Sequence, residues 1–287
     1  RLMQERPAAI LTGAAIIMKA LGVDVCYVGI EENKPEAIAC MAAAAKNCPG
    51  VVIVKLAKKY PQGGEKQLID AVMRRQVKSG GLPISVGAVV QNVATALAVY
   101  EAVQKNKPLI TNTLTVTGNC LPEERQHNYL FRIGIPLSYI AEYAGGIPEG
   151  AAKIISGGPM MGKAIANLDA STVKGSSSIL YLDEKTTKRH EEQNCIRCGR
   201  CADACPMGLE PFLLNRLYKV KDVSGLEDNA AQDCIECGCC LYSCPSYIPL
   251  LDNIRQAKGQ VMGVIRARAA AAKAAAEAAK AAQTEKK

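Results

Sequence analysis

Two short cysteine runs, at residues 195–206 and 234–245, constrain this chain more than any other feature. Both follow the pattern C-x2-C-x2-C-x3-C-P, and each cysteine of the first run recurs 39 residues later in the second. This pattern is the bacterial signature of a [4Fe–4S] site. Three cysteines at this spacing can wrap a tight loop so that their thiolates converge on one cube. The fourth, whose backbone is limited by the following proline, reaches out to the other cube.

Each loop is therefore expected to lend its last cysteine to the cluster of the other loop. The first cluster is predicted to be held by Cys195, Cys198, Cys201 and Cys244. The second is predicted to be held by Cys234, Cys237, Cys240 and Cys205. Because the two halves share ligands, we expect neither half to fold without metal. Cys239 lies off the pattern and is expected to be a packed thiol that binds no iron.

Structural zinc and disulfide bonds are the alternatives for so many cysteines. Zinc sites generally use pairs of C-x2-C, and disulfides belong to oxidising compartments and small secreted folds. The triple spacing followed by C-P therefore favours iron–sulfur clusters. The cysteines outside the runs stand in apolar contexts and are predicted to be buried free thiols: Cys26, Cys40, Cys48 and Cys120. Reduced cysteines and oxygen-sensitive clusters both indicate the cytosol.

Composition narrows the remaining possibilities. The 287 residues suggest two or three domains, and a hydrophobic content of 49% without Trp indicates aliphatic, Ala-rich cores. No run of apolar residues is long enough to span a bilayer. Of the net charge of +8, +6 falls in residues 255–287, so no basic, aromatic-interleaved patch indicates a nucleic acid partner. The chain begins at Arg1 in mid-pattern, which we interpret as a truncation without a signal peptide.

The first 110 residues have the pattern of an α/β layer. The predicted order is a helix at 8–21, a strand at 23–30, a helix at 33–48, a strand at 51–56, a helix near 67–75, a strand at 84–90 and a helix to 103. Strand, helix and strand in succession indicate right-handed crossovers in an α/β fold.

Two loops of this layer meet helix N-termini, where free N–H groups favour anions or electron-rich ligand edges. The first is the loop at 63–66, and the second is the junction at Asn92, with Thr95 three residues on. A plain helix N-cap is the alternative for Asn92. Because caps are common at such junctions, residue chemistry alone favours the cap over a ligand contact.

The next segments indicate a small α+β module and then helices around the cysteine runs. The predicted elements are strands at 109–117, 153–156 and 178–182, and helices at 137–144, at 209–221 and from 250 onward. The last helix leads into a nearly all-Ala tail, which is predicted to be helical and solvated. A docking arm for an anionic membrane surface is the alternative for this basic tail.

Several segments together resemble a known family. They read GIEENKPEAI at 29–38, YPQGGEKQLI at 60–69, SGGLPISVGAVVQNVATA at 79–96 and SGGPMMGKA at 156–164, and they accompany the two cysteine runs. The chain resembles the C subunit of the Rnf electron-transport complex, a family related to the flavin subunit of respiratory complex I. The resemblance covers nearly the whole chain, whereas a ferredoxin alone would lack everything before residue 190.

The resemblance implies a domain order and a flavin site. It implies an α/β FMN/NAD-type domain at 1–110 with its N-terminal part missing, a β-grasp-like module at 111–184, an α-helical two-[4Fe–4S] ferredoxin-like domain at 185–256 and an Ala/Lys-rich helical tail at 257–287. It places cofactor contacts at Gly63, Gly64, Glu65, Lys66, Asn92 and Thr95. Lys66 stands where the family's flavin subunits have a second acid, and the family's glycine-rich opening segment is absent, so only part of the FMN pocket is expected here.

The function implied by the resemblance is that of an electron-transfer subunit in a membrane-associated ferredoxin:NAD+ oxidoreductase. It would move electrons between two [4Fe–4S] clusters and FMN/NAD(H), with ion transport carried out by partner subunits. The partners implied are other Rnf-type membrane subunits, especially an iron–sulfur subunit, on the cytoplasmic face of the cell membrane. No catalytic acid–base residue is predicted. The alternatives are a cobalamin-reductase-type flavin/iron–sulfur protein and a polyferredoxin-like conduit without flavin.

Overall fold

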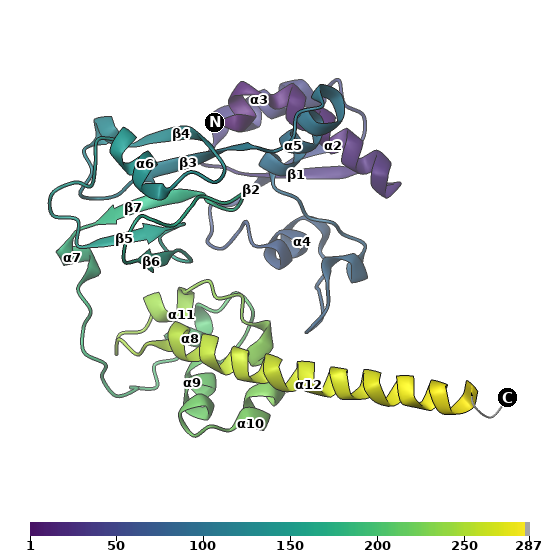
Figure 1. Ribbon diagram of the computed structural model, residues 1–287, viewed down its shortest axis with the longest axis vertical. Helices are drawn as coiled ribbons and strands as arrows, with labels where there is room; N and C mark the ends of the chain where they lie inside the picture. The colour runs from purple at the N-terminus through teal and green to yellow at the C-terminus, as the bar shows by residue number, and fades with distance from the viewer. Residues whose placement is uncertain (285–287) are drawn as a thin grey trace. The chain divides into compact units, whose positions relative to one another are not determined.

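The computed structural model describes the backbone of residues 1–284 and the side chains of residues 1–277 (Figure 1). The chain forms two compact units, which are described separately. Unit 1 comprises residues 1–156 and 164–182, and unit 2 comprises residues 157–163 and 183–287. The end of the predicted tail, residues 285–287, lies outside the described residues.

Unit 1 opens with helices α1 (Leu2–Glu5) and α2 (Pro7–Leu21) and a βαβ unit. Strands β1 (Cys26–Glu31) and β2 (Val51–Leu56) are parallel and are joined by α3 (Pro35–Ala45). Proline stands at the first turn of both α2 and α3, where its missing N–H costs nothing, and Gly22 ends α2 with φ 65°. The predicted helices and strands of residues 8–56 are confirmed, with shifts of a few residues at their ends.

Two further helices follow, and between them one prediction is wrong. Helices α4 (Glu65–Met73) and α5 (Val93–Lys105) are present, but residues 84–90 do not form a strand. Instead, the short 3-10 helix η1 (Pro83–Val86) ends at Gly87, whose φ of 69° lies in the left-handed region. A residue in this conformation cannot continue a strand, so the apolar run bends instead of pairing.

The core of this part of unit 1 lies where α2 packs against α5 and α3. Ile10, Met41 and Leu97 are buried together with their apolar neighbours. Gly13 permits the close crossing of α2 and α5, because a Cβ at this position would lie 1.8 Å from the carbonyl oxygen of Ala96. The crossing therefore depends on the absence of one side chain.

The second half of unit 1 is a five-stranded mixed sheet with one helix, α6 (Leu137–Tyr143). The strands are β3 (Thr111–Thr117), β4 (His127–Arg132), β5 (Lys153–Ser156), β6 (Lys163–Ile165) and β7 (Ser178–Leu182), in the order β4-β3-β7-β5-β6. Strand β3 is antiparallel to β4 and parallel to β7. The short 3-10 helix η2 (Glu123–Arg125) precedes β4. The α+β character is confirmed; β4 and β6 had not been predicted.

Unit 2 is helical apart from its loops. It contains α7 (Glu184–Thr187), α8 (Arg200–Asp203), α9 (Pro211–Lys219), α10 (Val223–Asp228), η3 (Ala231–Asp233), α11 (Cys239–Tyr242) and α12 (Leu250–Thr284). Helix α12 buries Leu250, Ile254, Ala257 and Val261 in the same core as Leu214 and Leu226, and these four residues form one stripe at i, i+4, i+7 and i+11. It continues without a break into the Ala-rich segment, since Ala favours the helix most strongly. Within residues 1–284, no helix is long and apolar enough to cross a membrane.

Candidate functional site

The two cysteine loops of unit 2 share one backbone conformation. Arg197 and Glu236, each between the first two cysteines of its run, have φ of 56° and 58°, and Gly199 and Gly238 have φ of 77° and 83°. Each glycine is followed at once by a one-turn helix, α8 or α11. Left-handed residues at these two points wrap the chain into a tight loop. The sequence repeat is therefore also a structural repeat.

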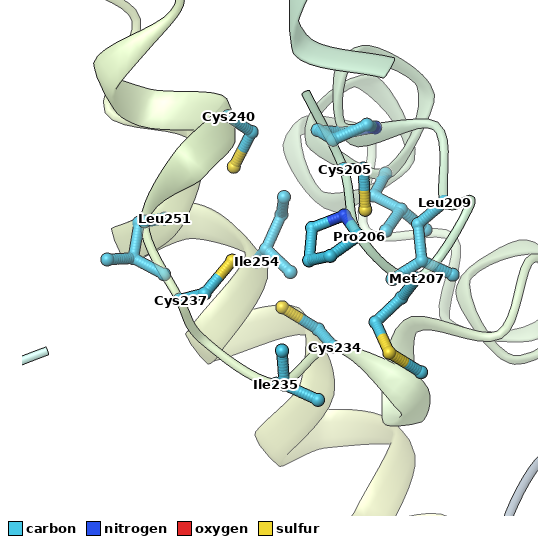
Figure 2. A pocket seen from close by; sticks show the side chains of 13 residues that line it. Cys205, Pro206, Met207, Leu209, Cys234, Ile235, Cys237, Cys240, Leu251 and Ile254 are labelled. Carbon is cyan, nitrogen blue, oxygen red and sulfur yellow. The ribbon is translucent and has the colours of Figure 1, made fainter. Parts of the chain in front are cut away.

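Four cysteines from both runs converge in one small cavity of about 20 Å³. Figure 2 shows the sulfur atoms of Cys205, Cys234, Cys237 and Cys240 around the same space. Its remaining walls are largely apolar and include Pro206, Leu209, Leu251 and Ile254. Cys205 thus lies with the cysteines of the other run, which is the arrangement that the crossed ligand assignment requires.

The pKa values of these thiols reflect their burial and their proximity. Burial raises the pKa of Cys240 to about 12, and the neighbouring Cys234 and Cys205 add to the effect. Cys239 does not line this cavity, but burial, a hydrogen bond with Cys237 and the charges of Cys237 and Cys205 raise its pKa to about 11. Iron binds thiolates, so loading this site must release protons that burial otherwise holds on the sulfur atoms.

The first cluster loop is more open. Cys195 and Cys198 are exposed, Cys201 is buried and Cys244 is half-buried. Cys244 packs against the core cluster that contains Cys201. Burial raises the pKa of Cys201, and the charge of Cys244 adds to the effect. The structure therefore brings Cys244 to the first run, as it brings Cys205 to the second.

The state and the grouping of the cysteines can be compared with the zinc and disulfide alternatives. All thirteen cysteines lie in the described part of the chain, and each is a free thiol. Among the described residues, no three His, Cys, Asp or Glu side chains are grouped closely enough to hold a single metal ion. Ligands of one Zn²⁺ at Zn–S distances of about 2.3 Å would be crowded around a point, whereas thiolates around a cube stand further apart. The choice of a cluster over zinc therefore rests on the triple cysteine spacing followed by Cys-Pro.

Helix α12 holds the second loop through an ion-pair network. Lys258 Nζ donates to the carbonyl oxygen of Cys234 at 2.7 Å and to Glu236 Oε1 at 3.1 Å. Arg255 Nε donates to Glu236 Oε2 at 3.0 Å. Burial raises the pKa of Glu236, but the hydrogen bonds and charges of Lys258 and Arg255 lower it below its ordinary value. This network had not been predicted, because nothing local in the sequence pairs a helix with a loop twenty residues away.

The predicted flavin loops are both at helix N-termini in unit 1. Gly64 is the N-cap of α4 and has no side chain that could cap the helix, and Glu65 and Lys66 lie in the first turn of α4. Asn92 is the N-cap of α5, and its Oδ1 accepts a hydrogen bond from the N–H of Ala94 at 2.9 Å. Thr95 lies in the first turn of α5. The cap alternative for Asn92 is thus correct, and a cap does not exclude a ligand contact.

A cavity of about 390 Å³ opens beside the second of these helix N-termini. It is lined by α2, β1, α4, the segment after η1 and the start of α5. The apolar run at 84–90 forms part of its wall, which explains why that run is apolar without being a strand. Asn92 lines the cavity, whereas the other five predicted contacts, Gly63, Gly64, Glu65, Lys66 and Thr95, do not.

The size and lining of this cavity fit part of a flavin. Small-molecule sites are typically apolar clefts of about 300–1,000 Å³ with a few polar groups, and Gln91 and Asn92 are such groups here. Among the described residues that line the cavity, none is Lys or Arg. The lining therefore suits an apolar ring system and provides no charged partner for a phosphate.

Comparison with known families agrees with this order of parts. Residues 1–101 match the Nuo51 FMN-binding domain, and residues 187–245 match the 4Fe-4S dicluster domain. Among solved structures, an NAD+-reducing [NiFe]-hydrogenase in the H2-reduced state has the same fold, with a TM-score of 0.56 at 17% identity over 91% of this chain and 53% of that one. The chain thus joins a segment similar to the Nuo51 FMN-binding domain to one similar to the 4Fe-4S dicluster domain.

Sequence relatives identify the family more closely. The chain is 48% identical over 217 residues to the C subunit of the proton-translocating ferredoxin:NAD(+) oxidoreductase complex of Clostridium ljungdahlii, covering 76% of this chain and 47% of that protein. It is 38% identical to the C subunit of the Na(+)-translocating complex of Acetobacterium woodii, covering 91% of this chain and 58% of that protein. The chain spans about half the length of the curated relatives it matches. Over most of its length it is a homologue of the Rnf complex C subunit, which confirms the resemblance.

Proposed function

We propose that this chain is the electron-transfer part of a C subunit in an ion-translocating ferredoxin:NAD+ oxidoreductase. Subunits of that name are its relatives in Clostridium ljungdahlii and Acetobacterium woodii. When bound, FMN exchanges a hydride with nicotinamide and single electrons with [4Fe–4S] clusters. The role of the chain is to hold these groups, with ion transport carried out by partner subunits that include an iron–sulfur subunit.

The observation that carries this proposal is the convergence of Cys205 with the cysteines of the second run. Such crossing is what a two-cluster ferredoxin requires, and a chain of independent zinc loops has no reason to produce it. We assign Cys195, Cys198, Cys201 and Cys244 to one cluster and Cys234, Cys237, Cys240 and Cys205 to the other. Burial of the second set and its apolar walls would set the potential of that cluster.

Finer features of the architecture and location belong to the same proposal. The sheet at 111–184 would be a β-grasp-like module between an FMN/NAD-type domain at 1–110 and a cluster domain at 185–256, with the helical tail at 257–287. The relatives' names describe ion-translocating complexes, so we place the chain peripherally on membrane subunits at the cytoplasmic face.

Iron analysis of single variants tests the cluster assignment. Protein purified without oxygen is expected to contain eight iron atoms per chain, because two four-iron clusters are bound. Cys205→Ser is expected to lose about half of the iron and the second cluster's electron paramagnetic resonance signal, whereas Cys239→Ser, its matched control, keeps both. Equal iron in the two variants, or a zinc signal in place of iron, would contradict the assignment.

Substitutions at Asn92 separate a ligand contact from a helix cap. Asn92→Ala removes the cap of α5 and is expected to cost about 1 kcal/mol of stability. Asn92→Ser keeps a capping oxygen but not the amide, so it is expected to restore stability and leave FMN affinity reduced at least fivefold. Fluorescence titration with FMN measures the affinity. Full recovery of affinity in the serine variant would show that Asn92 acts only as a cap.

A further inference from the structure

The 39-residue repeat of the cysteine runs extends into the helices that follow them. Arg216 and Lys219 of α9 recur at the same offset as Arg255 and Lys258 of α12. The two lysines nevertheless have different partners. Lys219 Nζ pairs at 2.7 Å with Glu192, which precedes the first run, whereas Lys258 Nζ reaches into the second run itself. The repeat in sequence therefore does not extend to the use of this charge.

Lys258 is held against the second cysteine run by two hydrogen bonds. Ile254, one turn earlier on α12, lines the cavity into which the cysteines of this run point. Residues four apart lie on one face of a helix, so Lys258 is on the face that meets the run. Its Nζ donates to the carbonyl oxygen of Cys234 at 2.7 Å and to Glu236 Oε1 at 3.1 Å. The ammonium group is thus fixed at the backbone of a proposed iron ligand.

The ion-pair network around Lys258 is nearly balanced in charge and partly shielded from water. The side chains of Lys258 and Glu236 are 27% and 35% exposed. Arg255 is shared between Glu236 at 3.0 Å and Asp252 at 3.9 Å, so the network holds two acids and two bases. Salt screens partly buried charges much less than exposed ones. Loss of the Lys258 charge would therefore leave one uncompensated negative charge beside the second loop.

The same network holds a residue that bonds a ligand sulfur. The backbone N–H of Glu236 donates to Cys234 Sγ at 3.4 Å. Net charge and hydrogen bonds to the sulfur atoms are both determinants of the reduction potential of an iron–sulfur cluster. Lys258 can therefore act on the second loop through its charge and through its hold on Glu236.

We propose that Lys258 sets the reduction potential of the second cluster, by stabilising its reduced form with a positive charge at Cys234. The reduced form carries one more negative charge than the oxidised form, so a nearby cation favours it. The inference rests on the proposed function, because it requires a cluster at Cys205, Cys234, Cys237 and Cys240. It adds a residue outside the cysteine runs that regulates how readily this cluster accepts an electron.

Redox titration of charge variants tests the proposal. The full chain is loaded with iron and sulfide without oxygen and titrated with dithionite and mediators, while electron paramagnetic resonance follows the second cluster, whose signal is the one that Cys205→Ser removes. Lys258→Gln keeps an amide donor but no charge, and is expected to lower the ratio of reduced to oxidised second cluster at a fixed potential at least fivefold. Glu236→Gln removes the opposite charge and is expected to raise that ratio at least fivefold. A tenfold change in the ratio corresponds to about 59 mV for a one-electron couple.

The opposite signs separate an effect of charge from a loosened loop, which would move the potential in the same direction in both variants. If one of the two variants binds no second cluster, the sign of the shift in the other decides. Lys258→Arg keeps the charge and is expected to stay within about twofold of the unmodified chain. Lys219→Gln is the matched control, because it removes the same charge at the equivalent position of the repeat, and it should leave the second cluster within about twofold.

Three results would overturn the role of Lys258: shifts smaller than fivefold, shifts of the same sign in both glutamine variants, or an equal shift in Lys219→Gln. Iron content separates this inference from the proposed function. An unmodified chain that takes up no iron overturns both, whereas iron-loaded variants with unchanged potentials overturn this inference alone.

Discussion

Replacing Gly13 by alanine tests the packing of α2 against α5 beside the cavity of unit 1. In unit 1, α2 crosses α5 so closely that a Cβ at position 13 would lie 1.8 Å from the carbonyl oxygen of Ala96 and 2.6 Å from its carbonyl carbon. Ordinary van der Waals contact begins near 3.4 Å. The two helices must therefore separate by about 1.5 Å, since the obstacle is backbone and cannot rotate away.

Two effects of opposite sign decide the outcome. Alanine within a helix is more favourable than glycine by about 1 kcal/mol. Overpacking of a tight contact costs about 1–3 kcal/mol, and a clash with backbone lies at or above the upper end of that range. We expect Gly13→Ala to be less stable by about 2 kcal/mol, which lowers Tm by roughly 4–8 °C in a unit of this size.

Urea unfolding followed by far-UV circular dichroism measures the change. The matched control is Gly263→Ala in α12, where a Cβ meets nothing within 4 Å, and it is expected to gain about 0.5–1 kcal/mol. Because α2 and α5 both line the cavity, FMN affinity should also fall in Gly13→Ala and stay unchanged in Gly263→Ala. If Gly13→Ala is as stable as the unmodified chain, the two helices do not cross as closely as described.

Two further predictions concern unit 1. Thr172 is 2% exposed, and its hydroxyl donates to the carbonyl oxygen of Ile135 at 3.0 Å and accepts from the N–H of Gly134 at 3.1 Å. Thr172→Val removes this hydroxyl and should lower the free energy of unfolding by about 1–3 kcal/mol, as measured by chemical unfolding. Burial raises the pKa of Glu101, but hydrogen bonds and charges from Lys107 and Arg6 lower it below its ordinary 4.5. These pairs therefore stabilise the fold above pH 4.5 and are lost as the pH falls through the lowered pKa. The free energy of unfolding of Glu101→Gln should be lower than that of the unmodified chain by roughly 1 kcal/mol at pH 7, and the two should become equal in acid. If the difference between them is the same at both pH values, the ion pairs of Glu101 do not cause it.

Features encoded by short local patterns were predictable from the sequence. The strands at 51–56, 153–156 and 178–182 have the predicted bounds, because β-branched and aliphatic runs flanked by glycine or proline determine them locally. The cysteine spacing likewise predicts the loops and the partner run for the last cysteine of each. Strand β4 was missed because its sequence does not alternate: the apolar Leu130 is 76% exposed between half-buried Tyr129 and buried Phe131.

Features that depend on distant residues were not predictable. The run at 84–90 is as apolar as a strand, but Gly87 in the left-handed region and the neighbouring cavity give it another role. Periodicity cannot distinguish a buried strand from a cavity wall. The network of Lys258, Arg255 and Glu236 arises only once α12 packs on the second loop.

The segment at 157–163 has a consequence for how the protein can be divided. It lies between β5 and β6 in the sequence, yet its contacts group it with the cysteine loops, where Met160 covers Gly238. A fragment cut from residue 185 onward would keep the eight cysteines proposed as ligands and still lose Met160, which lies against Gly238. Such a fragment should lose iron to chelators and oxygen faster than the intact chain, so a linear cut at the linker does not yield an autonomous ferredoxin.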